Sequence, residues 1–201
     1  MIEINNLCKS YKDYKIYDDF NLRIEKNAII GLIGPSGIGK TTLFRCIAGI
    51  ESHSGEIVCK GRISYLFQED RLFPWLNIRQ NILLPLKLIG KDPDEGDLKK
   101  MTDLADMMDI SEHLEKKVNQ ISGGQKQKVL IVRALIADPD ILLIDEAFKS
   151  LDKDSCASIY QKFVDFCRAN NKIAIIATHD DNMLDSVDYV IDLSKLEGIV
   201  R

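Results

Sequence analysis

Residues 28–33 read Ala28-Ile-Ile-Gly-Leu-Ile33, and the chain continues Gly34-Pro-Ser-Gly-Ile-Gly39-Lys40-Thr41-Thr42. This stretch decides the fold, because an apolar strand, the pattern Gly-x-x-x-x-Gly-Lys-Thr and a following helical segment form the context of a phosphate-binding loop. Glycines let consecutive backbone N–H groups converge on one anion, and the positive end of the helix dipole adds to their effect. We expect Lys40 to contact the β- and γ-phosphates of a nucleotide, and the Thr41 hydroxyl to contact Mg²⁺. The residues expected to bind the nucleotide here are Gly34, Pro35, Ser36, Gly37, Ile38, Gly39, Lys40, Thr41 and Thr42.

Three further apolar runs, over residues 63–67, 141–144 and 173–177, lack the alternation of a half-exposed strand. Such runs are typical of parallel strands covered by helices on both faces. Helical segments over 40–48 and 152–168 separate them, the second with Asp152 as N-cap. Alternation over 2–7 and 20–24 predicts a separate antiparallel edge. The predicted fold class is therefore α/β, with a mostly parallel sheet flanked by helices.

More than 70 residues between Phe67 and Ile141 contain no convincing strand. Within them, residues 94–108 place their apolar side chains, Leu98, Met101, Leu104, Ala105 and Met108, on one helical side. We therefore predict a single domain, residues 1–201. Residues 1–71 and 136–201 form its α/β core, and residues 72–135 form an inserted helical subdomain.

At four places a glycine or a polar residue follows the end of a predicted apolar strand. These residues are Gly34, Gln68, Asp145 and His179. Ligands of open α/β sheets bind at the carboxyl ends of the strands, so we expect these positions to face one site. Asp145 suits a Mg²⁺ partner and Glu146 a group that orients or activates water. Each feature alone has a more common structural explanation, such as a solvated strand end or a surface histidine. His53 and His113 lack this convergence and are predicted to be surface residues.

Ser122-Gly123-Gly124-Gln125 precedes a segment that is first polar and then apolar through Ala137. This pattern predicts a helix with an exposed N-terminus, which is a second place where an anion is favoured. An ordinary N-cap serine is the structural alternative.

Over nearly its whole length, the chain resembles the nucleotide-binding subunit of ATP-binding cassette (ABC) transporters. The family's motifs occur in order: an aromatic at Tyr11, the phosphate loop, a Q-loop at Gln68, the signature at residues 122–125, the Asp145-Glu146 strand end, a D-loop at Ser150-Leu151-Asp152 and a switch histidine at His179. The sequence departs from the common pattern at residues 26–28, at Ile121, at Ala147 and at Lys149, none of which is a catalytic position.

The resemblance implies a P-loop NTPase core and an ATPase that uses ATP and Mg²⁺. Tyr11 would stack on adenine, with Tyr14 and Tyr17 as alternatives. Thr41, Gln68 and Asp145 would hold the metal, while Glu146, His179 and Gln68 would act in hydrolysis. Two copies would pair head to tail, so that Ser122, Gly123, Gly124 and Gln125 of one cover the ATP of the other.

The string Gln68-Glu-x-x-Leu-Phe-Pro-Trp75 resembles the ATPases of nitrate, sulfonate, taurine and thiamine-precursor importers. That resemblance implies import of such a solute through a separate transmembrane permease, fed by an extracellular solute-binding protein. Leu72, Phe73 and Trp75 would meet the permease, or alternatively pack inside the subdomain. The place of action would be the cytoplasmic face of a bacterial cell membrane.

The composition excludes several other classes. The 201 residues are 45% hydrophobic and carry a net charge of −4, so no global positive field attracts nucleic acid. No apolar run approaches the ~20 residues needed to span a bilayer, and the first residues do not resemble a secretory signal. An odd set of five cysteines without C-x-x-C spacing predicts reduced thiols.

Two other classes of function compete with a transporter ATPase. A soluble P-loop kinase or GTPase would lack the motif seen here at residues 122–125 and the pair Gln68 and His179. The alternative function is that of a soluble ABC-type ATPase acting on nucleic acid or ribosomes, although such proteins usually carry tandem cassettes or long coiled coils.

Overall fold

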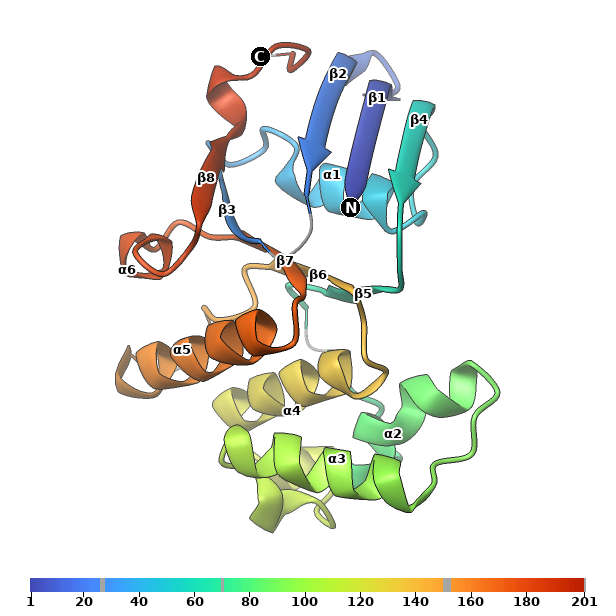
Figure 1. The fold of residues 1–201 in the computed structure, drawn as a ribbon, viewed down its shortest axis with the longest axis vertical. Helices are drawn as coiled ribbons and strands as arrows, with labels where there is room; N and C mark the ends of the chain where they lie inside the picture. Colours follow the sequence, from blue (N-terminus) through green and yellow to red (C-terminus); the bar gives the residue numbers. More distant parts are fainter. Residues whose placement is uncertain (26–27, 70, 150–152, 201) are drawn as a thin grey trace. The chain divides into compact units, whose positions relative to one another are not determined.

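The computed structural model describes residues 1–25, 28–69, 71–149 and 153–200, with side chains described from Cys156 onward in the last range. The chain divides into two compact units, each of which is drawn in Figure 1. The first unit comprises Met1–Tyr65, Asp140–Asp145 and Val164–Arg201, and the second comprises Leu66–Pro139 and Glu146–Phe163.

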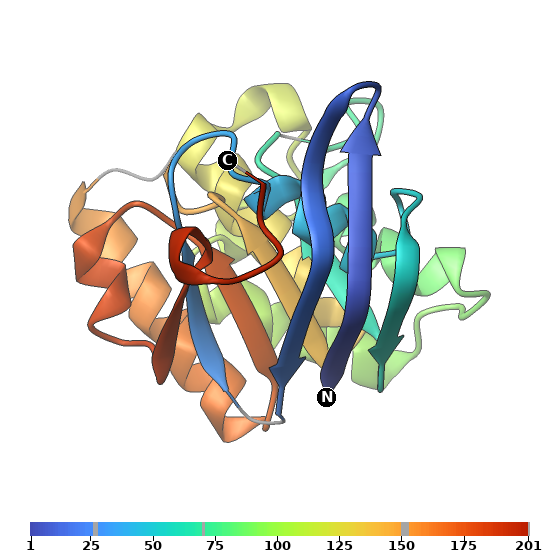
Figure 2. The same cartoon turned by 90° about the horizontal axis from the view of Figure 1, so that it is seen from above.

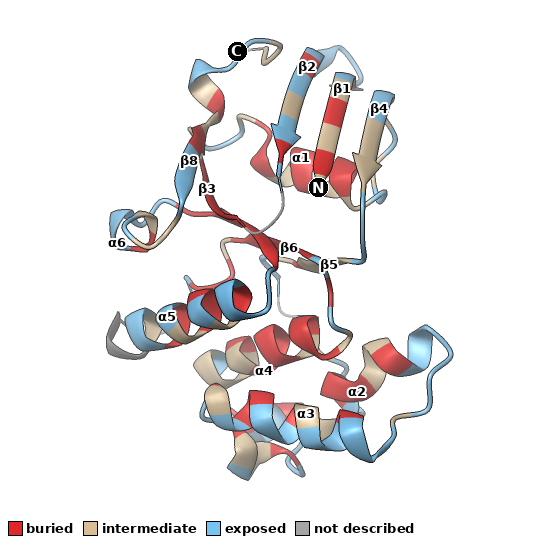
Figure 3. Ribbon diagram, viewed as in Figure 1, coloured by how far each residue is buried: buried red, intermediate tan, exposed pale blue. Residues whose placement is uncertain are grey.

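A five-stranded sheet in the order β5-β6-β7-β3-β8 forms the centre of the first unit. Its strands are β3 (Ile29–Ile33), β5 (Ile63–Leu66), β6 (Ile141–Asp145), β7 (Ile173–Ala177) and β8 (Tyr189–Asp192). Strand β7 pairs in parallel with β6 and β3, and β3 pairs in parallel with β8. Strands β6 and β7 are buried at every residue (Figure 3), which is why their sequences are continuously apolar.

A second, antiparallel sheet has the order β2-β1-β4, seen from above in Figure 2. It consists of β1 (Ile2–Tyr11), β2 (Tyr14–Ile24) and β4 (Ser54–Cys59). Helix α1 (Lys40–Ile47) follows the phosphate loop and contributes Leu43 and Phe44 to a core that it shares with both sheets. Burial of these apolar side chains fixes α1, and with it the loop that precedes α1.

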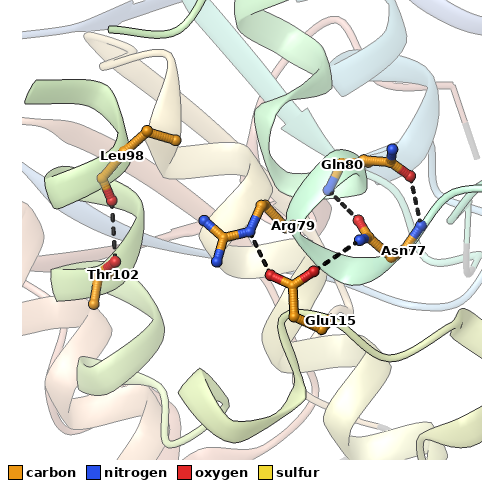
Figure 4. A network of polar contacts seen from close by, with 6 residues as sticks. All are labelled: Asn77, Arg79, Gln80, Leu98, Thr102 and Glu115. Atoms are coloured by element: carbon orange, nitrogen blue, oxygen red, sulfur yellow. Dashed lines mark hydrogen bonds and ion pairs between the residues drawn. The ribbon is translucent and has the colours of Figure 1, made fainter. Parts of the chain in front are cut away.

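The second unit contains α2 (Ile78–Leu88), α3 (Glu95–Met107) and α4 (Gly123–Ile136), and both α2 and α3 pack on α4. Each helix begins with a reciprocal capping box, formed by Asn77 and Gln80, by Asp94 and Asp97, and by Ser122 and Gln125. The predicted apolar face of α3 is buried from Met101 onward. Leu98 is the exception, 38% exposed in the first turns of the helix, where its carbonyl oxygen accepts a bond from Thr102 (Figure 4).

Helix α5 (Lys153–Ala169) begins in the second unit and ends in the first. Its apolar side chains Ile159, Tyr160, Phe163 and Cys167 are all buried, and Cys156 on the same side is half-buried. The predicted N-cap Asp152 and the D-loop at 150–152 lie outside the described residues. A short helix, α6 (Asp181–Leu184), follows β7. All five cysteines are free thiols in the structure. None of the helices in the described ranges has both the length and the apolar character needed to cross a membrane.

Candidate nucleotide site

The phosphate loop of the first unit depends on glycine backbone geometry. Gly34, Gly37 and Gly39 have φ values of 145°, 81° and 116°, which lie in the region that favours glycine. Gly39 caps α1 in a left-handed conformation, and a Cβ built there would lie 2.7 Å from Ile16 Cγ2 and 2.8 Å from the Tyr17 hydroxyl oxygen. Backbone conformation and close packing therefore both require glycine at this position.

Lys40 is the first residue of α1 and is only 7% exposed. Its Nζ atom donates to the carbonyl oxygens of Gly34 at 2.7 Å and Pro35 at 3.2 Å, so the ammonium group lies against the loop itself. The first turn of α1 contains no acidic side chain. The lysine charge and the helix N-terminus therefore act together in favour of an anion.

The three tyrosines considered for adenine stacking have different environments. Tyr17 is fully buried, and its hydroxyl donates to the Gly39 carbonyl at 2.9 Å, so this ring supports the loop and has no face open to a base. Burial also raises the pKa of Tyr17. Tyr11 is 40% exposed, with the Lys9 ammonium 4.5 Å from the centre of its ring. Tyr14 is exposed and lines an open pocket with Pro35, Ser36, Gly37 and Ile38. The assignment of Tyr11 stays a prediction.

Neighbouring strands place Asp145 and His179 at the edge of the sheet where the phosphate loop begins. Ala177 is in register with Asp145 on one side and with Leu32 on the other, so β6, β7 and β3 end at one level. Thr178 is buried, and its N–H donates to the Leu32 carbonyl at 3.4 Å. His179 follows it and is exposed.

Asp145 is a buried carboxylate, 3% exposed, and its Oδ2 accepts a hydrogen bond from the Tyr65 hydroxyl at 3.0 Å. Burial and then the neighbouring Asp145 charge raise the pKa of Tyr65, so this phenol stays a donor. The described residues contain no cluster of three or more His, Cys, Asp or Glu side chains that could hold a metal. A hydroxyl at Thr41 and a carboxylate at Asp145 nevertheless fit Mg²⁺, which usually takes only one or two carboxylates and completes its shell with water and phosphate oxygens.

In the second unit, Gln68 and Glu146 contact each other. The Gln68 Nε2 atom donates to Glu146 Oε2 at 3.4 Å, and the Lys149 ammonium lies 3.6 Å from the same oxygen. Glu146 has a φ of 51°, which is unusual for a residue with a side chain. Such backbone strain, which costs of order 1–3 kcal/mol, is found preferentially at functional sites.

The signature residues form the start of α4. Ser122 is the N-cap, its Oγ accepts from the Gln125 N–H at 3.2 Å, and its own N–H donates to Gln125 Oε1 at 2.8 Å. A Cβ built on Gly123 would meet no atom of the described residues within 4 Å. Packing against the described part of the chain therefore does not require glycine at 123.

Comparison with known proteins assigns the chain to a family. The ABC transporter family profile matches residues 17–149. This chain belongs to the ABC transporter family. The sulfate/thiosulfate import ATP-binding protein CysA of Pseudomonas aeruginosa is 32% identical to this chain. The match covers all of this chain and 65% of the length of CysA. The spermidine/putrescine import ATP-binding protein PotA of Thermotoga maritima is 37% identical to this chain. The match covers all of this chain and 57% of the length of PotA. The chain thus spans less than two thirds of the length of each of these relatives.

Solved structures of ABC cassettes share its fold. A dimeric, post-hydrolysis structure of the ATP-binding cassette MJ0796 bound to ADP and Pi superposes with a TM-score of 0.88 at 27% identity, covering 100% of this chain and 97% of the other. A second dimeric structure of MJ0796, a bacterial ABC transporter cassette, gives a TM-score of 0.86 at 27% identity, covering 98% and 97%. The predicted P-loop α/β fold with an antiparallel edge is confirmed.

Two residues of this ABC transporter chain make contacts that the sequence does not predict. Tyr65, in β5, is expected from sequence only to be part of an apolar strand, yet it bonds Asp145. His113, predicted to be a surface residue, is half-buried rather than fully exposed, and its Nε2 lies 2.6 Å from the Nε2 of Gln125. The structure thus adds one residue beside Asp145 and one beside the signature segment. His53 is also half-buried rather than fully exposed.

Proposed function

We propose that this chain is the ATP-hydrolysing subunit of an ABC importer. The observation that carries the proposal is the phosphate loop, where the Lys40 ammonium lies against the loop at the start of α1 and Asp145 ends a strand of the same sheet. We also propose the division into an α/β core (1–71 and 136–201) and a helical subdomain (72–135).

In this proposal the loop from Gly34 to Thr42 binds the phosphates, Lys40 neutralises the β- and γ-phosphates, and Tyr11 stacks on adenine. Thr41, Gln68 and Asp145 would hold Mg²⁺, which when bound neutralises developing phosphate charge. The Tyr65 hydroxyl keeps one Asp145 oxygen fixed by a hydrogen bond, which favours a single orientation of the carboxylate.

Glu146 is proposed to orient the attacking water and to take its proton. Gln68 and Lys149 both contact Glu146 Oε2, so they favour a single direction of this carboxylate. The water oxygen bonds to the γ-phosphorus while the bond from that phosphorus to the β–γ bridging oxygen breaks. His179 would donate to the γ-phosphate, and the products are ADP and phosphate.

We infer that two copies act together, head to tail. Ser122, Gly123, Gly124 and Gln125 of one copy would cover the ATP bound by the other. The open space around Gly123 supports this role, because it leaves the backbone approachable at the start of a helix. The MJ0796 cassettes that share the fold are dimeric.

The partner in the membrane is proposed to be a separate permease that docks on Phe73 and Trp75. Phe73 is 37% exposed and Trp75 is 69% exposed, and the two rings pack edge to face at 5.3 Å. An exposed aromatic pair is typical of an interface anchor. We propose import of a small oxyanion, sulfonate, taurine or thiamine-precursor-like solute. An extracellular binding protein would deliver it to the permease, and this chain would act at the cytoplasmic face of a bacterial membrane.

Phosphate release by the purified chain tests the proposed ATPase. Lys40→Ala should abolish hydrolysis, because the charge on the β- and γ-phosphates is lost. Glu146→Gln should still bind ATP but hydrolyse it more slowly by about a hundredfold or more, the usual contribution of a general base. Glu69→Gln, which changes an exposed carboxylate paired with Arg71, is the matched control and should keep the wild-type rate. A wild-type rate in Glu146→Gln would exclude its proposed role.

A further inference from the structure

We propose that His113 is a positioning residue for the signature segment, acting through the side chain of Gln125. This inference rests on the proposed function, because the segment matters only if it faces ATP in a partner copy. His113 ends the short helical turn Ser111–His113, and its Nε2 lies 2.6 Å from the Nε2 of Gln125. The contact joins two segments of the second unit that are twelve residues apart in sequence.

The hydrogen bonds of Gln125 decide the direction of this contact. Gln125 Oε1 accepts from the Ser122 N–H at 2.8 Å, so the amide nitrogen is the end that faces the imidazole ring. An amide nitrogen can donate a hydrogen bond but cannot accept one. His113 Nε2 must therefore be the acceptor, and the proton of the neutral ring must be on Nδ1.

The other side of the ring supports a positioning role. Within the described part of the chain, His113 Nδ1 is buried and has no hydrogen-bond partner. A buried donor without a partner costs free energy. The ring thus keeps an unfavourable Nδ1–H while its Nε2 holds the Gln125 amide.

The turn that carries His113 is attached to the start of α2. The Arg79 N–H donates to the Leu114 carbonyl at 2.8 Å, and Arg79 Nε donates to Glu115 Oε1 at 2.6 Å. Asn77, the N-cap of α2, donates to the other Glu115 oxygen at 3.2 Å (Figure 4). Because this turn is held by α2, His113 can impose a position on Gln125.

Gln125 transmits that position to the signature segment, since it forms both bonds of the capping box with Ser122. Without an acceptor at 113, the Gln125 amide can rotate, and the Ser122 N–H then loses a fixed partner. His113 thereby keeps the start of α4 in one arrangement before a partner's ATP arrives.

The test compares His113→Leu, which removes the acceptor, with His113→Gln, whose amide oxygen can restore it. Both are made in the full chain and compared with wild type by steady-state ATP hydrolysis and by ¹⁵N NMR of histidine-labelled protein. We expect an unprotonated Nε2 and a protonated Nδ1 for wild-type His113. His113→Leu should lower kcat by about tenfold, the equivalent of one hydrogen bond, with KM for ATP little changed. His113→Gln should recover most of kcat.

Two results would overturn the inference: a proton on Nε2 of His113, or a wild-type kcat in His113→Leu. If His113→Leu fails to fold, the tautomer of the wild-type ring and the kcat of His113→Gln test the inference instead. A tenfold lower kcat in His113→Gln than in wild type would then count against the inference. Absence of ATP hydrolysis in the wild type would instead overturn the proposed function itself.

Discussion

The Tyr65 hydroxyl donates a hydrogen bond to the Asp145 carboxylate over 3.0 Å, joining a residue of β5 to the last residue of β6. Tyr65→Phe removes this bond but keeps the ring, which packs edge to face on Phe44 at 6.0 Å. We expect the free energy of unfolding to fall by about 1.5–3 kcal/mol, the range for hydrogen bonds to charged groups. Urea unfolding measures this loss, and an unchanged midpoint would contradict it.

The position of Tyr65 shows what sequence can and cannot predict. The strands over 29–33, 141–145 and 173–177 are predictable because they are buried on both faces and therefore continuously apolar. The order β5-β6-β7-β3-β8 is set by pairings between distant segments, so no local pattern places Tyr65 beside Asp145.

Strands β4 and β8 escape sequence prediction for a related reason. β4 has no buried residue, and β8 is only four residues long with Tyr189 and Val190 each 42% exposed. β4 begins with Ser54, Gly55 and Glu56, and the three apolar residues that open β8 are too few to distinguish a strand from part of a helix. The contact of His113 with Gln125 likewise depends on where a turn lies in space. The phosphate loop, in contrast, is predictable because its function requires a contiguous sequence.

Gly39→Ala tests the geometry of the phosphate loop. The added Cβ would lie 2.7 Å from Ile16 Cγ2 on a backbone with a φ of 116°, so both contact and conformation are unfavourable. We expect a loss of stability of about 1–3 kcal/mol and weaker nucleotide binding. Gly37→Ala is the matched control, because its φ is 81° but its Cβ would meet no atom of residues 1–25, 28–69, 71–149 or 153–200 within 4 Å. Urea unfolding should show the smaller loss for Gly37→Ala, and equal losses would exclude the contact as the cause.

The ion pair of Lys9 and Glu51 predicts a pH dependence of stability. Lys9 Nζ lies 2.8 Å from Glu51 Oε1, and this hydrogen bond lowers the pKa of Glu51 below 4.5 and raises the pKa of Lys9 above 10.5. A lowered carboxylate pKa stabilises the fold above the unfolded pKa and loses its effect as the pH falls through the folded pKa. A raised lysine pKa stabilises below the unfolded pKa and loses its effect as the pH rises through the folded pKa.

Glu51→Gln should therefore lower the free energy of unfolding most near neutral pH, and the difference from wild type should shrink toward about pH 3. Glu56→Gln, which changes an exposed carboxylate on β4, is the control and should show little change between these conditions. Urea unfolding at both pH values measures the difference. A Glu51→Gln effect that is the same at both would contradict the prediction.

Trp75→Glu tests the proposed docking surface. The backbone beside it is fixed, because buried Asn81 accepts from the Phe73 N–H at 2.8 Å and donates to the Phe73 carbonyl at 3.1 Å. The side chain of Trp75 is largely exposed, so the variant should unfold at the wild-type temperature. Loss of an aromatic anchor typically costs ~2 kcal/mol or more of association, so co-purification with the permease-containing membrane fraction should fail. Leu88→Glu, at the end of α2 and 76% exposed, is the control. Normal co-purification of Trp75→Glu would place the docking surface elsewhere.

Mixing two inactive variants tests whether the signature segment acts on the partner's ATP. Ser122→Arg removes the N-cap of α4 and places a bulky side chain at its start, while Lys40→Ala removes the phosphate-binding charge. Each homodimer then has two defective sites. A mixed dimer has one intact site, made of the phosphate loop of the Ser122→Arg chain and the signature segment of the Lys40→Ala chain. Random pairing gives mixed dimers in about half of the population, so phosphate release should reach up to about a quarter of the wild-type rate. If the signature segment served its own chain, every mixed dimer would lack an intact site. Differential tagging confirms that mixed dimers have formed. Phosphate release at the background rate would then count against the head-to-tail arrangement.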